Sequence, residues 1–304
     1  MVIKMEYISI KEASVKWNIS ERSIRNYCIN KRIEGAILEK GEWKIPSNSN
    51  KPTRLNAKTD KNYLLDQLRL EKKNRIKGGI YHCFQVLMTY NSNHIEGSKL
   101  SHDETRFIFE TRTISLDVNE DRKTINVDDI IESINHFECI DKVIDSANYP
   151  LTERFIKELH RLLKLNTASA RLPYFNIGEY KSRPNTIGGE ETTPPMLVGK
   201  EINKLLKEYL KKDKHTLNEI IDFHVKFEKI HPFQDGNGRV GRLIILKECL
   251  KNNIVPFIIF DDVKLFYYRG LKKWNNDDRY LIDTCLHCQD RIKETLDYFK
   301  INYK

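Results

Sequence analysis

The chain has 304 residues, of which 39% are hydrophobic and 31% are charged. This composition can supply the core of one large domain and a small one. The sequence has no run of about 18 apolar residues and no apolar segment after Met1 that would indicate a signal peptide, so we expect a cytoplasmic protein without a membrane span. The six cysteines are scattered, which argues against a secreted disulfide framework. Cys285 and Cys288 share a CxxC spacing, but without a second pair we expect reduced cysteines and no metal.

The net charge of +9 is concentrated near the N-terminus. Residues 1–58 contain twelve Lys or Arg and six Asp or Glu, so about a fifth of the chain carries most of the excess. This distribution is typical of a module that binds a polyanion.

Two short helices joined by a tight turn are predicted within this basic segment. Ser9 and Glu12 have the spacing of a capping box at the start of the first helix. Asn18 indicates the turn, and Ser20 can cap a second helix that continues through Tyr27. The pattern therefore indicates a helix-turn-helix.

A predicted β-hairpin, or wing, follows at residues 37–46. Residues 47–52 have the composition of a linker, and we assign the linker to residues 51–62. We assign residues 1–50 to a first domain, in which residues 5–50 resemble the winged helix-turn-helix modules of the excisionase and MerR type. The resemblance implies double-stranded DNA as a partner, with the second helix in the major groove and the wing on the backbone. The implied contact residues are Arg22, Ser23, Arg25, Asn26, Lys40 and Lys44. A protein-docking use of the same fold and a purely structural cap stay open as alternatives.

The remaining domain, residues 63–304, is predicted to be mainly helical because its apolar residues recur at 3.6-residue spacing. The predicted helices cover residues 81–95, 101–117, 128–146, 151–165, 200–212, 216–230, 238–251, 261–275 and 278–299. Thr216 and Glu219 form a capping-box pattern, so a helix leads directly to His231. His224 lies on roughly the same face, and we interpret it as a packed or supporting histidine.

Ser92 and Glu96 are four residues apart and therefore share a helix face. Gly97 is suited to end that helix before Ser101 begins another. Taken alone, such a short pattern is more often a solvent-facing glutamate at a helix end.

A β-hairpin is predicted within residues 183–195. Gly188 and Gly189 are paired glycines between β-prone residues, a pattern that disfavours a helix. An exposed hairpin edge can align an extended target segment by main-chain hydrogen bonds, although a plain surface loop is the alternative.

Residues 231–242 combine an imidazole, a carboxylate, two glycines, an amide and two arginines. Gly236 and Gly238 can take positive φ and leave their N–H groups unobstructed. A helix is predicted to follow, so an anion would bind at its N-terminus. Arg239 and Arg242 carry guanidinium groups that suit phosphate oxygens. The segment therefore predicts a phosphate-binding active site.

Two further side chains extend this chemistry. Asp235 is a hard oxygen ligand that suits a magnesium ion shared with phosphates. His231, at the entrance of the segment, is suited to accept a proton. A phosphate transfer with a general base is the reaction type that these groups indicate.

The same segment matches the HPFx(D/E)GNGRxxR signature of the Fic family at every defined position. The resemblance covers roughly residues 65–300 and implies an all-α bundle with a short β flap. Most members transfer AMP from ATP to a hydroxyl side chain of a target protein, with magnesium bridging the phosphates. By resemblance, His231 is the base, Asp235 the magnesium ligand and Phe233 a core anchor. The nucleotide-binding residues implied in this segment are Gly236, Asn237, Gly238, Arg239, Val240, Gly241 and Arg242.

Two other segments resemble parts of the Fic nucleotide site. The flap residues Ile187, Gly188, Gly189 and Glu190 would lie over the nucleotide and align the target hydroxyl. Tyr267, Tyr268 and Asn275 resemble the adenosine side of the pocket, because aromatic faces stack on purines and Asn can bond their edges. A helix-core role for the two tyrosines is the alternative.

The string from Ser92 to Gly97 resembles the inhibitory motif (S/T)xxxE(G/N) of Fic proteins, on an inhibitory helix at about residues 81–97. The resemblance implies that Glu96 pairs with Arg242 and occupies the guanidinium that the γ-phosphate needs. We therefore predict an autoinhibited protein AMP-transferase that uses ATP and magnesium. One alternative is AMP removal, with Glu96 positioning a water, and another is a DNA-bound regulator whose Fic domain senses nucleotide. The target, which can be the protein itself, and a homodimer are not defined by the sequence.

Overall fold

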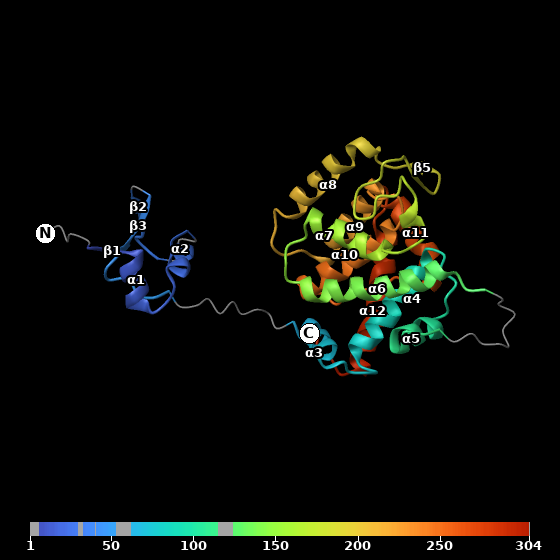
Figure 1. The fold of residues 1–304 in the computed structure, drawn as a ribbon, viewed down its shortest axis with the longest axis horizontal. Coiled ribbons are helices and arrows are strands. Elements are labelled where there is room, and N and C mark those ends of the chain that lie inside the picture. Colours follow the sequence, from blue (N-terminus) through green and yellow to red (C-terminus); the bar gives the residue numbers. More distant parts are fainter. Residues whose placement is uncertain (1–5, 30–32, 40, 53–61, 115–123, 304) are drawn as a thin grey trace. The chain divides into compact units, whose positions relative to one another are not determined.

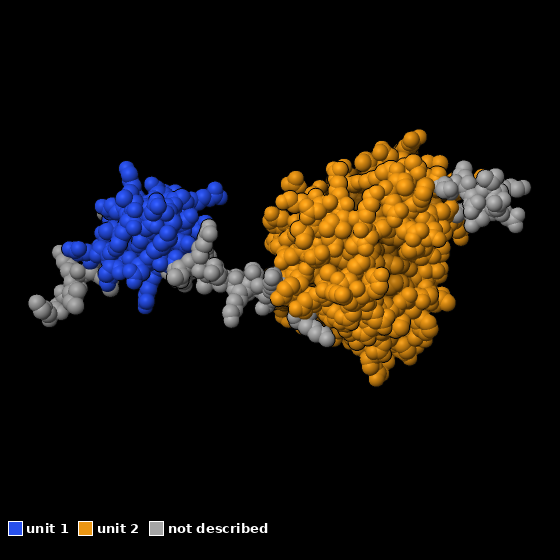
Figure 2. All heavy atoms as spheres, turned by 90° about the horizontal axis from the view of Figure 1, so that it is seen from below, with its two compact units in different colours: residues 1–59 blue, residues 60–304 orange. Residues whose placement is uncertain are grey.

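The computed structural model describes residues 6–29, 33–39, 41–52, 62–114 and 124–303. The chain divides into two compact units, residues 1–59 and 60–304 (Figure 2). Three predictions fall at least partly outside the described residues: the DNA contact Lys40, residues 115–117 of one helix, and residues 53–61 of the linker.

The smaller unit contains two helices and a three-stranded antiparallel sheet (Figure 1). Its elements are β1 (Tyr7–Ser9), α1 (Ile10–Trp17), α2 (Glu21–Ile29), β2 (Ile37–Glu39) and β3 (Glu42–Pro46). The strand order is β1-β3-β2, with Tyr7 opposite Pro46 and Ile37 opposite Lys44. The core of this unit consists of Ala13, Trp17, Ile24, Cys28, Ile33 and Ile45.

Local chemistry sets both ends of α1. The Ser9 side chain accepts from the Glu12 N–H, and the Glu12 carboxylate accepts from the Ser9 N–H at 2.7 Å. At the other end Asn18 takes a left-handed conformation with φ 50°, which asparagine tolerates better than most residues. The predicted capping box and turn are confirmed.

The larger unit is mainly helical. Its helices are α3 (Tyr63–Asn74), α4 (Ile80–Ile95), α5 (His102–Thr111), α6 (Val127–Ser146), α7 (Glu153–Lys164), α8 (Pro195–Tyr209), α9 (Leu217–Ile230), α10 (Asn237–Lys251), α11 (Lys264–Lys273) and α12 (Arg279–Tyr298). Short 3-10 helices cover Ser169–Arg171 and Asp261–Val263, and a two-stranded hairpin consists of β4 (Thr186–Ile187) and β5 (Glu190–Glu191). None of the described helices has the length and apolar composition needed to cross a membrane.

Two helix starts differ from the prediction. Helix α8 begins at Pro195 instead of residue 200, because proline suits the first turn of a helix. The predicted helix at 261–275 begins with the 3-10 turn, and α11 starts only at Lys264.

Helix α10 is the central element of the larger unit (Figure 1). It packs against α4, α6, α7 and α9, and every residue from Asn237 to Leu250 is buried. The N-terminal half of this helix carries two arginines of the predicted site. Buried guanidinium groups need charged or polar partners, so the elements around α10 must supply them.

Candidate active site

Helix α9 ends at His231, whose backbone is left-handed with φ 50°. The His231 Nδ1 lies 3.3 Å from the carbonyl oxygen of Glu228. Since a carbonyl oxygen only accepts, Nδ1 carries the proton in this contact and Nε2 keeps its lone pair. Burial is the largest influence on this imidazole and lowers its pKa to about 4. His231 is therefore neutral at pH 7 and can accept a proton through Nε2.

The residues after His231 form a tight loop that Asn237 closes. Asn237 Oδ1 accepts from the Phe233 N–H at 2.8 Å, and its Nδ2 donates to the Phe233 carbonyl at 2.9 Å. Phe233 is buried and stacks on His160 with ring centroids 3.9 Å apart. The Asn237 side chain thus shapes the loop. Its backbone N–H belongs to the first turn of α10, whose N–H groups have no partner within the helix and suit an anion.

The three glycines of residues 231–242 serve two purposes. Gly236 has φ 80°, which lets the chain turn into α10. The predicted positive φ of Gly238 is wrong, because this residue lies within α10. A Cβ at Gly238 would lie 2.2 Å from Glu96 Oε1, and one at Gly241 would lie 2.6 Å from Glu228 Oε1. These two glycines therefore allow carboxyl groups to approach the helix.

Arg242 is held by the last turn of α4. Its Nε donates to Ser92 Oγ at 2.9 Å, and its NH2 donates to the Ser92 carbonyl at 3.0 Å and to Glu96 Oε1 at 2.7 Å. Gly97, with φ 103°, follows Glu96 directly. Of the three predicted inhibitory residues, Ser92 and Glu96 therefore contact the guanidinium of Arg242.

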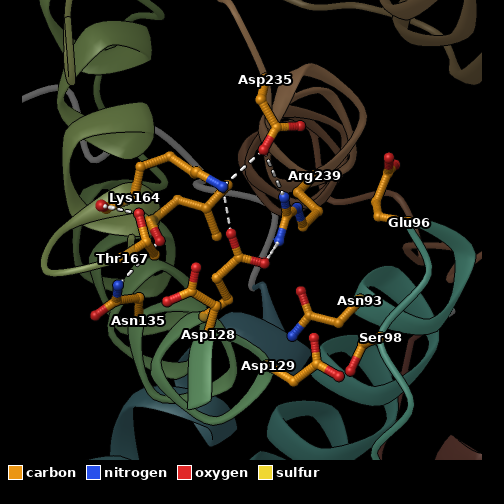
Figure 3. Close-up of polar contacts among 12 residues, drawn as sticks. Asn93, Glu96, Ser98, Asp128, Asp129, Asn135, Lys164, Thr167, Asp235 and Arg239 are labelled. Carbon is orange, nitrogen blue, oxygen red and sulfur yellow. Dashed lines mark hydrogen bonds and ion pairs between the residues drawn. The ribbon is translucent and has the colours of Figure 1, made fainter. Parts of the chain in front are cut away.

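Arg239 belongs to a closed ring of four charges (Figure 3). Glu132 pairs with both Lys164 and Arg239. Asp235 Oδ2 lies 2.7 Å from Lys164 Nζ and 3.5 Å from Arg239 NH2. Burial alone would raise the pKa of Asp235, but the two cations outweigh it and lower this pKa to about 2. The Arg239 Nε is buried and has no partner among the described residues, which leaves a donor for a ligand.

The Asp235 carboxylate can offer an oxygen ligand to a magnesium ion that is shared with phosphates. The Asp235 side chain is half exposed, and no ion pair among the described residues involves its Oδ1. Within the described part of the chain, no group of three or more His, Cys, Asp or Glu side chains could hold a metal by itself. A hard cation would complete its coordination with water and phosphate oxygens.

The β4–β5 hairpin has Gly188 and Gly189 at its turn, with φ of 55° and 84°. Positive φ at both central residues is the requirement of a type I′ turn, so the paired glycines explain this hairpin. Ile187 and Glu190, on either side of the turn, are both exposed. The predicted flap hairpin is therefore present with exposed residues at its tip.

Lys181 anchors the base of the flap, and sequence reasoning missed it. Its buried Nζ donates to Asn185 Oδ1 at 2.7 Å, to Thr192 Oγ1 at 2.6 Å and to the Ile230 carbonyl at 3.3 Å. Asn185 in turn donates to the Phe233 carbonyl at 2.9 Å. Burial lowers the pKa of Lys181 to about 8. Hydrogen bonds thus connect the two ends of the flap to each other and to the loop that follows His231.

The two tyrosines of the predicted adenosine pocket have different surroundings. Tyr267 is buried, and its hydroxyl lies 2.6 Å from His224 Nε2. This position agrees with the alternative role of Tyr267 in the helix core. Tyr268 is 44% exposed, and its hydroxyl donates to the Ile95 carbonyl at 3.3 Å. Asn275 Oδ1 accepts from Lys229 at 2.8 Å. Of the two rings, Tyr268 is the one exposed enough to stack on a ligand.

Glu228 is a second residue that the sequence did not reveal. Its carboxyl oxygens lie 3.9 Å from His224 Nδ1 and 3.9 Å from His231 Nδ1. Burial raises the pKa of Glu228 to about 8, so the group is protonated at pH 7. A glutamate inside an amphipathic helix has no sequence signal that distinguishes it from a solvent-facing one.

The predicted DNA contacts lie in the smaller unit. Arg22, Arg25 and Asn26 are exposed on α2, and Arg25 pairs with Glu21 at 3.3 Å. Ser23 is half-buried and its hydroxyl lies 2.9 Å from that of Ser20. The Lys44 residue is half-buried on β3. Among the described residues, the predicted DNA contacts that are exposed therefore all lie on α2.

Comparison with known proteins matches residues 150–249, which include the segment 231–242, to the model of the Fic/DOC family. The protein adenylyltransferase Fic of Nematostella vectensis is 27% identical over 245 residues, which are 78% of this chain and 53% of that protein. A probable protein adenylyltransferase of Aquifex aeolicus is 27% identical over 162 residues, 51% of this chain and 50% of that protein. The chain spans about half the length of these curated relatives.

A solved structure has the same fold as the larger part of the chain. It is a Fic domain containing signaling protein from Bacteroides thetaiotaomicron, with a TM-score of 0.62 and 23% identity over 79% of this chain and 98% of that one. The predicted helical bundle with a small β-hairpin is therefore confirmed. The winged helix-turn-helix assignment stays a prediction.

Proposed function

We propose that this chain is a protein adenylyltransferase that moves AMP from ATP to a hydroxyl side chain of a target protein. The observation that carries the proposal is a neutral His231 at the start of the loop that leads to the N-terminus of α10, a helix with two buried arginines. A base, an anion-binding helix terminus and guanidinium groups are the parts that phosphoryl transfer requires. The names of the curated relatives support the same activity.

In the proposed reaction, the target oxygen attacks the α-phosphorus of ATP. The bond from this phosphorus to the bridging oxygen breaks, and pyrophosphate leaves. His231 Nε2 takes the hydroxyl proton, while Arg239 and the N–H groups of α10 stabilise the phosphate charge. Asp235 would hold a magnesium ion, which supplies further charge neutralisation on the phosphates.

We further propose that Glu96 and Ser92 inhibit this reaction. Three of their oxygen atoms accept from Nε and NH2 of Arg242, so these donors are not available to a γ-phosphate. ATP would then bind with its phosphates out of line for attack. The Glu96 side chain is 28% exposed, which allows it to leave without opening the core.

The test is incubation of wild type, Glu96→Gly, Glu96→Gln and His231→Ala with α-labelled ATP and magnesium. We expect label on protein to rise in both Glu96 variants and to vanish in His231→Ala. The glutamine variant separates loss of charge from backbone flexibility. Isothermal titration should show that His231→Ala still binds ATP, and loss of binding would reassign His231 to a structural role. Absence of label in every variant would refute the transferase.

AMP removal is a second candidate, because the Glu96 carboxylate lies beside Gly238 at the start of α10. From there it can orient a water toward a bound phosphoryl group. An AMP-modified target incubated with wild type would then release AMP, and Glu96→Gly would not release it. Equal release of AMP by wild type and Glu96→Gly would exclude a role of Glu96 in AMP removal.

For the smaller unit, we infer binding to double-stranded DNA through α2. The exposed Arg22, Arg25 and Asn26 on a basic unit support this inference. Replacing Arg22 and Arg25 by alanine should weaken binding, and each lost phosphate contact should lower the salt slope by about one. Lys207→Ala, in the larger unit, is the control. Measuring DNA affinity with and without ATP tests the nucleotide-sensor alternative.

A further inference from the structure

The four charges around Asp235 form a ring in which carboxylates and cations alternate (Figure 3). Lys164 bridges Glu132 and Asp235, and Arg239 bridges the same two carboxylates. Two positive and two negative groups leave the ring without net charge. The carboxylate that would receive a metal is thus already neutralised by groups of the protein.

Lys164 is fixed in this position by its surroundings. Its side chain is 3% exposed, and its backbone carbonyl accepts from Thr167 Oγ1 at 2.9 Å. Asn135 donates to the carbonyls of Leu163 and Leu165, at 2.9 and 2.7 Å. The chain on both sides of Lys164 is therefore held, and the ammonium is not a surface charge that can move away into solvent.

A buried ammonium beside Asp235 opposes the approach of a second cation. Charges a few ångströms apart at the edge of a protein interact far more strongly than in bulk water. Without nucleotide, a divalent ion at Asp235 would face Lys164 and Arg239, whose two charges are only balanced by the two carboxylates of the ring. Bound phosphates reverse this balance because they add several negative charges at the start of α10.

We propose that Lys164 is a resident cation that keeps divalent metal off Asp235 until ATP arrives, so that metal enters only together with the nucleotide. Lys164 is then a residue that determines the order of binding. This inference rests on the proposed role of Asp235 as a metal ligand. It adds the condition under which that ligand becomes available.

The experiment measures Mn²⁺ binding to the full chain by the electron paramagnetic resonance signal of free Mn²⁺, with and without ATP, as the difference from samples that contain the same Mn²⁺ and ATP but no protein. Wild type should bind Mn²⁺ well only with ATP. Lys164→Met should bind Mn²⁺ without ATP at least about tenfold more tightly than wild type, since it leaves two carboxylates and one cation. Lys164→Arg, which keeps the charge, should behave like wild type.

Two further variants control for indirect effects. Lys157 lies on the same helix and also joins two carboxylates, Glu153 and Glu179, so Lys157→Met should leave Mn²⁺ binding unchanged. Adding Glu132→Gln to Lys164→Met should weaken the ATP-independent binding again. Thermal unfolding of each variant verifies that it is folded. If Lys164→Met is not folded, Lys164→Gln replaces it.

The outcomes separate the two proposals. Equal ATP-independent binding by Lys164→Met and wild type, with normal binding in the presence of ATP, overturns the role of Lys164 alone. The metal role of Asp235, and this inference with it, is overturned if wild type shows no ATP-dependent Mn²⁺ binding. It is also overturned if Asp235→Asn binds Mn²⁺ with ATP as tightly as wild type does.

Discussion

Arg239 and Arg242 lie three residues apart on α10 and are both buried, but their carboxylate partners differ in origin. Arg242 pairs with Glu96, which follows the last residue of α4 and precedes Gly97. Arg239 pairs with Glu132, inside the first half of the 20-residue helix α6. A partner at a helix end can withdraw with a small backbone change, whereas one within a packed helix cannot. An arginine–glutamate ion pair therefore suits regulation at Arg242 and stabilisation of the fold at Arg239.

Stability should separate the two pairs most strongly. Glu132→Gln leaves Lys164 and Arg239 buried with only Asp235 between them, so we expect a loss of about 4 kcal/mol in the free energy of unfolding. Glu96→Gln should lose about 1 kcal/mol or less, because Glu96 is more exposed and Ser92 still accepts from Arg242. Calorimetry of the larger unit's transition measures both.

Glu138→Gln is the matched control for this comparison. Glu138 also lies on α6 but pairs with Arg112 at the surface, so its loss should stay within about 0.5 kcal/mol. Equal losses for Glu96→Gln and Glu132→Gln would remove the distinction between a detachable and a built-in partner.

The contrast between the two pairs also marks what the sequence could predict. Glu96 stands in a short motif whose resemblance names its partner, although Arg242 is 146 residues away. The ring around Asp235 joins residues 71 and 107 positions apart, and neither Lys164 nor Glu132 belongs to a recognisable motif. Both fall within predicted helices, where a charged residue normally indicates a solvent-facing position. Only the packing of α6 and α7 against α10 turns these charges inward.

Local signals predicted the elements better than the contacts between them. Paired glycines predicted the flap hairpin, because the backbone of its turn needs positive φ. The same reasoning failed for Gly238, which is required by the nearby Glu96 carboxylate and not by its own backbone. The sequence also could not choose between stacking and core positions for Tyr267, since adjacent tyrosines in a helix point in different directions.

The pH dependence of stability should sharpen the comparison further. Asp235, between Lys164 and Arg239, has a pKa of about 2, whereas burial raises the pKa of Glu228 on the Arg242 side to about 8. A raised pKa means that Glu228 favours the folded state below about pH 4.5 and that this contribution is lost as the pH rises through 8. Glu228→Gln should therefore gain about 3 kcal/mol relative to wild type between pH 5.5 and 8.

This effect is measured by urea unfolding of wild type and Glu228→Gln at several pH values. The difference between the two proteins isolates one group, since all other titrations cancel. Asp235→Asn should show no such trend in this range, because a pKa of about 2 lies below it. A constant difference between Glu228→Gln and wild type would mean that Glu228 is ionised in the folded protein.

A smaller effect is expected at Ser92, which supplies part of the contact that we propose to be inhibitory. Ser92→Ala removes the hydroxyl that accepts from Arg242 Nε but keeps the backbone carbonyl and Glu96. A hydrogen bond to a charged donor contributes about 1.5 kcal/mol, so AMP transfer should rise about tenfold at most, and less than in Glu96→Gly. Initial rates with labelled ATP measure this, with Ser98→Ala as a control on the same segment. An unchanged rate would assign the restraint of Arg242 to Glu96 and the Ser92 carbonyl.

The smallest effect should come from Tyr268→Phe. The variant keeps the ring that we expect to stack on the nucleotide but loses the 3.3 Å hydrogen bond to the Ile95 carbonyl, one residue before Glu96. Such a long bond at a half-exposed group contributes about 0.5 kcal/mol, so we expect about a twofold rise in transfer and an unchanged Kd for ATP. Because the bond acts only by holding Glu96 in place, Tyr268→Phe should have no effect in the Glu96→Gly background. A twofold rise in both backgrounds would show instead that Tyr268 acts through the nucleotide, and that the end of α4 is held by its contacts to Arg242 alone.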